Sequence, residues 1–131
     1  MRKGEIDYRM QRRAVLLQVQ QGEVPLTDVQ DAHRELVRAG THIGRELDDP
    51  CPMCDGSQLR AVTYLFTGRA AKGKGEGGAA VPPAKLDAAL RRAGDCKVYE
   101  VEVCIDCGWH HLLESYWWMR QPAPRSQTTR A

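Results

Sequence analysis

The chain has 131 residues, of which 42% are hydrophobic, 27% charged and 6% aromatic, and its formal net charge is +2. This composition predicts one small globular domain, or a domain with appendages, whose core has few large apolar side chains. The near-neutral charge argues against the overall basic excess of a strong nucleic-acid binder. No apolar run approaches the roughly 18 residues of a membrane span, and no apolar signal segment follows the N-terminus, so we expect a cytoplasmic protein.

Residues 1–48 are predicted to form a helical hairpin. Ile6 to Gln21 contains no Pro or Gly, and its apolar residues fall on two faces, which predicts a helix packed on more than one side. Thr27, with Gln30 three residues later, is a candidate N-cap for a second helix that ends at Gly40. Its outward positions are Gln30, Asp31, Arg34, Glu35 and Arg38. The acidic side chains among them argue against a DNA-reading helix and favour packing or protein docking.

The middle of the chain begins with a cysteine pair and continues as a strand. Cys51-Pro52-Met53-Cys54 precedes the alternating, β-branched and aromatic run Leu59 to Thr67, which predicts a strand. Residues 68–80 hold five glycines and three basic residues, Arg69, Lys72 and Lys74, which predicts a flexible basic loop. Pro82-Pro83 then begins a short helix over residues 84–93.

The C-terminal third repeats the cysteine pattern between two strands. Val98 to Val103 alternates, with Val98, Glu100 and Glu102 on one face and Tyr99, Val101 and Val103 on the other. The strand leads into Cys104-Ile105-Asp106-Cys107, and residues 109–118 return as a third strand. Residues 120–131 are polar and contain prolines, so we expect a disordered tail.

The two C-x-x-C pairs predict a four-sulfur zinc site formed by Cys51, Cys54, Cys104 and Cys107. A C-x-x-C turn aims two thiolates the same way, and the glycines that follow, Gly56 and Gly108, allow the turn to close with a positive φ. Two disulfides or a redox pair are the alternatives, but the first requires an oxidising compartment and the second a βαβ context. Neither context is visible in the sequence.

Three residues near the cysteine pairs are candidates for other roles. Cys96 is expected to be a buried strand residue and not a metal ligand. His110 and His111 are expected to lie beside the metal shell or on the surface, because four cysteines already close it. No H-E-x-x-H or similar arrangement is present, so we expect no enzyme, no catalytic residue and no small-molecule substrate.

These elements together predict an α+β fold: an N-terminal helical hairpin (1–48), then a zinc ribbon (49–119), then the tail (120–131). The ribbon is expected to be a three-stranded antiparallel sheet with a loop-plus-helix insertion at 68–95. The long insertion does not weaken the metal prediction, because lengthening a surface loop costs little entropy.

The run from Asp7-Tyr8 through Arg12-Arg13 and Cys51-Pro52 to the Val101–Trp109 and His111–Leu112 stretch resembles an uncharacterised actinobacterial family of short proteins. That family is described as a domain of unknown function. The resemblance implies one continuous domain over about residues 5–117, and it implies no activity. The second cysteine pair with its glycine is also similar to ribbons of the transcription machinery.

Two hypotheses about function remain. In the first, a zinc-ribbon accessory protein of transcription or another nucleic-acid machine docks through its hairpin and offers its ribbon or basic loop to nucleic acid. Arg12, Arg13, Arg69, Lys72 and Lys74 are the candidate contacts. In the second, the chain is a protein-binding adaptor with a structural zinc and no nucleic-acid contact. Salt-dependent binding to nucleic acid separates the two.

Overall fold

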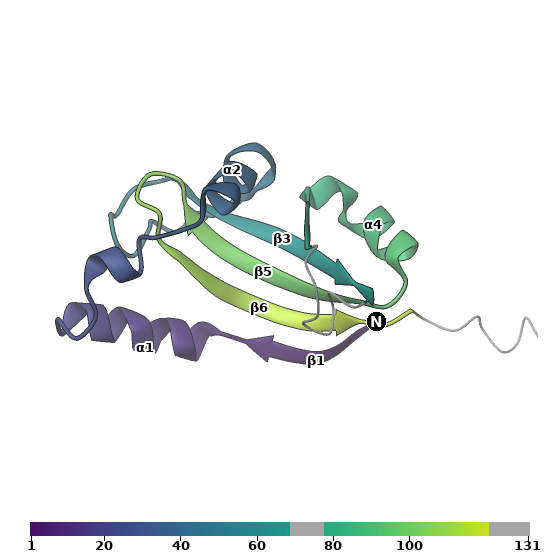
Figure 1. Ribbon diagram of the computed structural model, residues 1–131, viewed down its shortest axis with the longest axis horizontal. Helices are drawn as coiled ribbons and strands as arrows, with labels where there is room; N and C mark the ends of the chain where they lie inside the picture. The colour runs from purple at the N-terminus through teal and green to yellow at the C-terminus, as the bar shows by residue number, and fades with distance from the viewer. Residues whose placement is uncertain (69–77, 121–131) are drawn as a thin grey trace, which may run out of the picture.

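The computed structural model, which describes residues 1–68 and 78–120, has an α+β fold built on a six-stranded antiparallel sheet (Figure 1). The strand order is β1-β6-β5-β3-β2, and β4 pairs with β3 as well. The strands are β1 (Arg2–Asp7), β2 (Arg45–Glu46), β3 (Leu59–Thr67), β4 (Ala79–Val81), β5 (Cys96–Cys104) and β6 (His110–Trp118). The three long strands β3, β5 and β6 lie where the sequence predicts strands.

The prediction of a three-stranded sheet is wrong, because three short strands extend it. β1 pairs with β6 and ties the N-terminus to the last strand, while β2 and β4 share the outer edge of β3. The sequence predicts the first helix from Ile6, yet residues 2–7 are extended. Pairing with β6 supplies hydrogen bonds between strands that no local pattern reveals.

The helices are α1 (Arg9–Gln20), α2 (Arg34–Ile43) and α4 (Leu86–Ala93), with 3-10 turns at Leu26–Asp28 and Pro83–Lys85. The predicted helical hairpin over residues 1–48 is therefore wrong. α1 packs mainly on β6, and α2 packs on β3 and β5. The sheet, and not the other helix, supplies the main contacts of each. The predicted helix over residues 84–93 is confirmed.

The second helix begins later than the sequence predicts. His33 is its N-cap, and its Nδ1 accepts a hydrogen bond of 3.0 Å from the Glu35 N–H. Gly40, the predicted end, lies inside the helix and is buried. A Cβ at Gly40 would lie 2.8 Å from Val103 Cγ1. The glycine therefore lets the helix backbone approach β5 closely.

The sheet has two faces, which we name by the helices that cover them. On β5 the α4 face carries Val98, Glu100 and Glu102, and the α2 face carries Lys97, Tyr99, Val101 and Val103, as alternation predicts. Both core clusters lie on the α4 face. One is Leu65, Val81, Leu90, Cys96, Val98 and Tyr116, under α4; the other is Val29, Cys51, Leu59, Cys104 and Trp109, under α1.

Candidate metal centre

Two turns at one end of the sheet bring the four predicted cysteines together. The first turn (residues 51–56) precedes β3, and the second (residues 104–108) joins β5 to β6. Cys51 Sγ lies 3.7 Å from Cys107 Sγ, and Cys54 Sγ lies 3.6 Å from Cys104 Sγ. All four sulfurs lie within 4.8 Å of one another. Each of these two distances relates a sulfur of the first turn to a sulfur of the second. The cluster therefore brings the two turns together.

The sulfur spacing fits a tetrahedral metal ion. A tetrahedron with metal–sulfur bonds of about 2.3 Å places its sulfurs about 3.8 Å apart. A disulfide holds its sulfurs at about 2.05 Å, and all five cysteines of the chain are free thiols. The donor set therefore fits a four-coordinate ion and leaves no position for a fifth ligand.

Each turn is closed by backbone hydrogen bonds. The Asp55 N–H donates to Cys51 O at 2.9 Å, and the Gly108 N–H donates to Cys104 O at 3.0 Å. The residue after the second cysteine is left-handed in both turns, with φ of 60° at Asp55 and 85° at Gly108. The prediction of a positive φ is confirmed at Gly108, but in the first turn Asp55 takes that conformation in place of Gly56. Gly56 is instead needed for space, because a Cβ there would lie 3.2 Å from Cys54 Sγ.

A segment between the helices completes the wall of the cluster, and no local pattern in the sequence predicts it. The Ala32 N–H donates to Gly108 O at 3.0 Å, and Val29 is buried against the cysteine cluster. The Gln30 backbone lies against the second turn, because a Cβ at Gly108 would lie 2.7 Å from Gln30 O. Because residues 29–32 run along the second turn, they cannot continue a helix from Thr27. The predicted outward position of Gln30 is therefore wrong.

The thiols differ in their acidity. Burial raises the pKa of Cys51 to about 12 and also raises the pKa of Cys104. Burial acts in the same direction on Cys107, but hydrogen bonds from the Gln30 side chain and the Trp109 backbone, with the neighbouring thiols, lower its pKa overall. A metal ion must displace the protons of the buried thiols, so binding is coupled to proton release.

The remaining cysteine and the two histidines lie outside the cluster. Cys96 is fully buried at the far end of β5, opposite Thr67 and Trp118, as predicted. His110 Nε2 lies 2.9 Å from Asp31 Oδ1. The His111 ring stacks on Trp109 with centroids 6.0 Å apart. The histidines therefore brace the second turn and the end of β6.

A buried ion pair joins α1 to the metal end of the sheet. The Glu102 side chain is only 3% exposed and pairs with Arg12. The Trp109 Nε1–H donates to Glu102 Oε1 at 3.0 Å. Trp109 itself is fully buried beside Cys51 and Cys104. Arg12, Glu102 and Trp109 thus connect the first helix to the cysteine cluster. Arg12 is engaged with Glu102 and is not offered to a partner.

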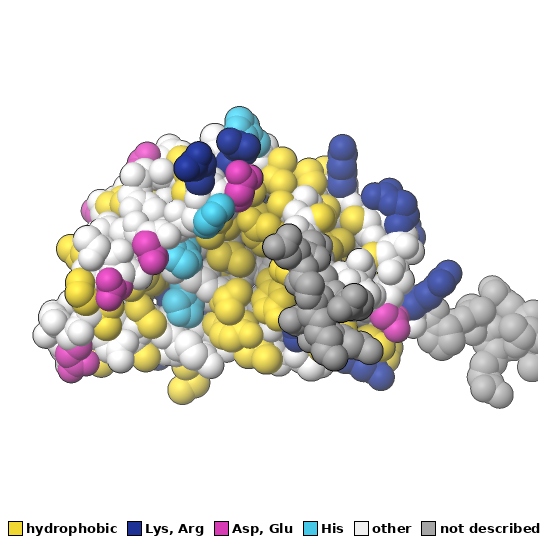
Figure 2. All heavy atoms as spheres, viewed as in Figure 1, with side chains coloured by type: hydrophobic (Ala, Val, Ile, Leu, Met, Phe, Trp, Pro, Cys, Tyr) yellow, Lys and Arg dark blue, Asp and Glu magenta, His cyan; other side chains and the backbone are white. Residues whose placement is uncertain are grey.

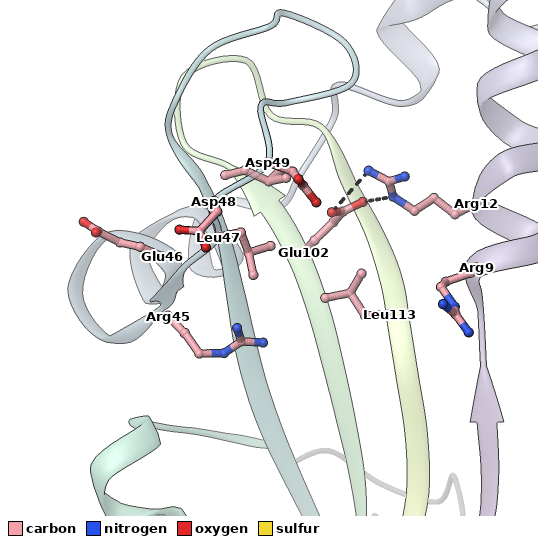
Figure 3. A pocket seen from close by; sticks show the side chains of 10 residues that line it. Arg9, Arg12, Arg45, Glu46, Leu47, Asp48, Asp49, Glu102 and Leu113 are labelled. Carbon is pink, nitrogen blue, oxygen red and sulfur yellow. Dashed lines mark hydrogen bonds and ion pairs between the residues drawn. The ribbon is translucent and has the colours of Figure 1, made fainter.

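A pocket of about 450 Å³ opens beside this pair (Figure 3). It is lined by Arg9, Arg12, Arg45, Glu46, Leu47, Asp48, Asp49, Leu59, Glu102 and Leu113. Figure 3 shows Arg12 and Glu102 pointing toward one another across it. Its three arginines pair with Asp7, Glu102 and Glu100. These ion pairs engage the arginines, and the acidic side chains of Asp48 and Asp49 lie beside them, so this pocket, as the described residues line it, has no excess of positive charge.

The other predicted contact residues are not gathered into one place. Arg13 is exposed on α1. Arg69, Lys72, Lys74 and most of the predicted loop, like the tail from residue 121, lie outside the described residues. Within residues 1–68 and 78–120, no helix is long and apolar enough to cross a membrane.

Comparison with known proteins supports the resemblance noted in the sequence. The sequence model of a family of unknown function (DUF5318) matches residues 1–131. Uncharacterized protein Rv0049 of Mycobacterium tuberculosis (strain ATCC 25618 / H37Rv) is 33% identical over 114 residues, covering 85% of this chain and 79% of the relative. Uncharacterized protein Mb0050 of Mycobacterium bovis matches to the same extent. No solved structure matches the chain significantly. The predicted resemblance to an uncharacterised actinobacterial family is confirmed.

Proposed function

The chain belongs to the family of unknown function DUF5318, and we propose that it is a zinc-ribbon accessory or regulatory protein of transcription or another nucleic-acid machine. In this proposal the zinc is structural and the protein is not an enzyme. The protein acts in the cytoplasm, where reducing conditions keep thiols free to bind metal. Its partners are another protein of that machine and the nucleic acid itself.

The choice of zinc rests on the donor set. Four thiolates in a tetrahedral arrangement select zinc or an iron–sulfur centre among biological metals. The spacing of the four sulfurs suits a single ion, and a closed S4 shell is typical of structural zinc. Because no ligand position is left for water or substrate, the ion holds the two turns together and performs no reaction.

The observation that carries the nucleic-acid proposal is the separation of charge across the sheet. Asp7 of β1 and the acidic residues of β5 and β6 lie on the α4 face, where each pairs with an arginine: Asp7 with Arg9, Glu100 with Arg45, Glu102 with Arg12, and Glu114 with Arg2. The acid of the edge strand β2, Glu46, lies on the α2 face and pairs with Arg60. On the α2 face, β3, β5 and β6 carry no acidic side chain. The lysines on this face of the three long strands suit a polyanion, although the whole chain is nearly neutral.

The test is binding of the full, zinc-loaded chain to labelled single-stranded and duplex oligonucleotides, measured by fluorescence anisotropy. We expect binding whose affinity falls as salt rises between about 50 and 200 mM, because cations of the protein displace condensed counterions. Absence of binding to both forms at the lowest salt contradicts the proposal.

A second candidate function, a protein-binding adaptor, is favoured by the outer side of α1. Met10 and Leu17 are 79% and 51% exposed, and Leu26 in the following turn is 53% exposed. The sequence predicts packing on both apolar faces of this helix, but among residues 1–68 and 78–120 only the face with Val15, Leu16 and Val19 contacts the core. An exposed apolar stripe of this kind suits a partner helix or groove.

Affinity capture from a native cytoplasmic extract tests the adaptor. The bait is the wild-type chain, and the variant is Met10→Glu with Leu17→Glu, both at exposed positions. Loss of a captured protein from the variant, together with an absence of nucleic-acid binding by the wild type, favours the adaptor over the nucleic-acid proposal.

A further inference from the structure

Aromatic side chains gather on the α2 face away from the metal. Lys97 of β5 lies opposite Phe66 of β3 and Trp117 of β6. Tyr99, two residues further along β5, lies opposite Tyr64 of β3. Cross-strand partners share a face, so these residues form one surface. We call Phe66, Lys97, Tyr99 and Trp117 the aromatic patch. Figure 2 shows hydrophobic side chains gathered over the strands beside α2.

The patch is ordered by contacts among its own members. The rings of Phe66 and Tyr99 meet edge to face, with centroids 5.5 Å apart and an interplanar angle of 80°. Lys97 Nζ lies 5.7 Å from the centroid of the Tyr99 ring and 5.2 Å from that of Trp117. A Cβ at Gly78 would lie 2.3 Å from Phe66 Cζ, so backbone closes one side of Phe66. Phe66 therefore supports Tyr99, and the half-buried rings of Tyr99 and Trp117 flank the ammonium group.

The charges around the patch favour an anionic ligand. Lys3 of β1 lies opposite Trp117 and extends the row that begins at Lys97. In the part of the chain that the structure describes, neither lysine forms an ion pair. Tyr64, further along the face, lies near Glu35 of α2, which pairs with Arg38. The two lysines therefore draw an anionic chain toward β5, β6 and β1.

We infer that the aromatic patch binds single-stranded nucleic acid. Bases stack on Tyr99 and Trp117, and Lys97 and Lys3 contact the phosphates. Stacking requires bases whose ring faces are open, which a duplex does not offer and a single strand does. A protein partner fits less well, because lysine is depleted in the cores of protein interfaces and its burial among rings must be compensated. This inference rests on the proposed function and specifies its ligand.

The experiment measures anisotropy of a labelled oligothymidylate of about 12 nucleotides, within the range that a single-strand binding module covers, and of the corresponding RNA and duplex. The zinc-loaded full chain is compared with Tyr99→Leu and Trp117→Leu, which keep apolar bulk and remove the ring. Tyr99→Phe keeps the ring and is the rescue variant. Trp118→Leu alters the neighbouring tryptophan on the α4 face and is the matched control. Circular dichroism and zinc content establish that each variant is folded.

We expect the wild type to prefer the single strand and each leucine variant of the patch to bind roughly ten- to a hundredfold more weakly, the loss typical of one stacked base. Tyr99→Phe and Trp118→Leu keep wild-type affinity. Lys97→Ala makes the negative slope of log affinity against log salt less steep by about 0.7, as expected for the loss of one phosphate contact on a single strand. Lys85→Ala, a change at the exposed lysine that precedes α4 on the opposite face of the sheet, leaves that slope unchanged.

Other outcomes overturn the inference in distinguishable ways. If the wild type binds nucleic acid and the leucine variants bind equally well, the patch is not the site, and the proposed function still stands. If the wild type prefers the duplex, stacking on the patch is wrong. If it binds neither form, both the inference and the proposed function fail. If, in affinity capture from the extract, the leucine variants lose a protein that the wild type retains, the inference is wrong and the patch is a protein-docking surface.

Discussion

The two faces of the sheet use alternate residues of the same strands for opposite purposes. On the α4 face, Glu102 is paired with Arg12 and buried under α1, and Cys96 and Val98 are buried under α4. On the α2 face, Tyr99 and Trp117 are half-buried with a lysine between them. The first face satisfies its charges internally and holds the fold together. The second leaves cations and rings available for a ligand.

The metal centre closes the α4 face, so its removal should have the largest effect. Cys104→Ser should abolish tight metal binding and unfold residues 51–118, because structural zinc contributes about 10–16 kcal/mol and a domain's net stability is about 5–15 kcal/mol. Metal analysis and circular dichroism measure the result. Cys96→Ala, at the buried thiol outside the cluster, should keep one metal ion per chain. A folded, metal-free Cys104→Ser protein would show that packing alone suffices.

Lowering the pH should also release the metal ion, because protons compete with it for the thiolates. Because burial raises the pKa of Cys51 to about 12, this thiol is protonated in the metal-free chain and metal binding releases the proton. Affinity should therefore fall as pH falls, about tenfold per pH unit for each proton released. Zinc release to a chromogenic chelator, followed from neutral to acidic pH, measures this. A release curve that is flat with pH contradicts coordination by these thiols.

Loss of the ion pair between α1 and the sheet should cause the next largest decrease in the free energy of unfolding. Arg12→Ala leaves the Glu102 carboxylate buried without its charged partner, and such a change costs about 3–5 kcal/mol. Chemical denaturation of the zinc-bound chain measures the loss. The control is Arg38→Ala, which removes an exposed pair with Glu35 and should cost at most about 1 kcal/mol. Equal losses in the two variants would show that Glu102 is not as enclosed as the structure indicates.

Disruption of the contact between α2 and β5 should cause the smallest decrease in the free energy of unfolding. Gly40→Ala places a methyl group 2.8 Å from Val103 Cγ1, and such overpacking costs about 1–3 kcal/mol, partly offset by the roughly 1 kcal/mol that alanine gains in helix propensity. Combination with Val103→Ala should restore part of the loss, which a double-mutant cycle detects. Strict additivity of the two changes would contradict a direct contact.

Local signals in the sequence identified the elements whose cause is local. Alternation and β-branched residues predicted β3, β5 and β6, and the prolines before residue 84 predicted the short helix. The paired cysteines identified the cluster because C-x-x-C spacing itself aims two sulfurs in one direction. The sequence also placed Cys96 in a strand, and the structure places it outside the cluster of four cysteines.

Other features depended on partners distant in the chain. β1 is a strand because β6 offers an open edge, and Arg12 is occupied because Glu102 lies across from it. Residues 29–32 do not form a helix, because Val29 packs against the cysteine cluster and the Ala32 N–H donates to Gly108 O. Helix propensity amounts to less than about 1 kcal/mol per residue and yields to such contacts.

The sequence by itself therefore determined which four cysteines cluster, the three long strands and the alternation of their side chains. Only the tertiary structure decided which alternating face would be covered. Helices α1 and α4 cover the acids and core residues of one face, and α2 covers part of the other. Burial of that kind depends on where distant elements pack, and periodicity along a strand carries no information about it.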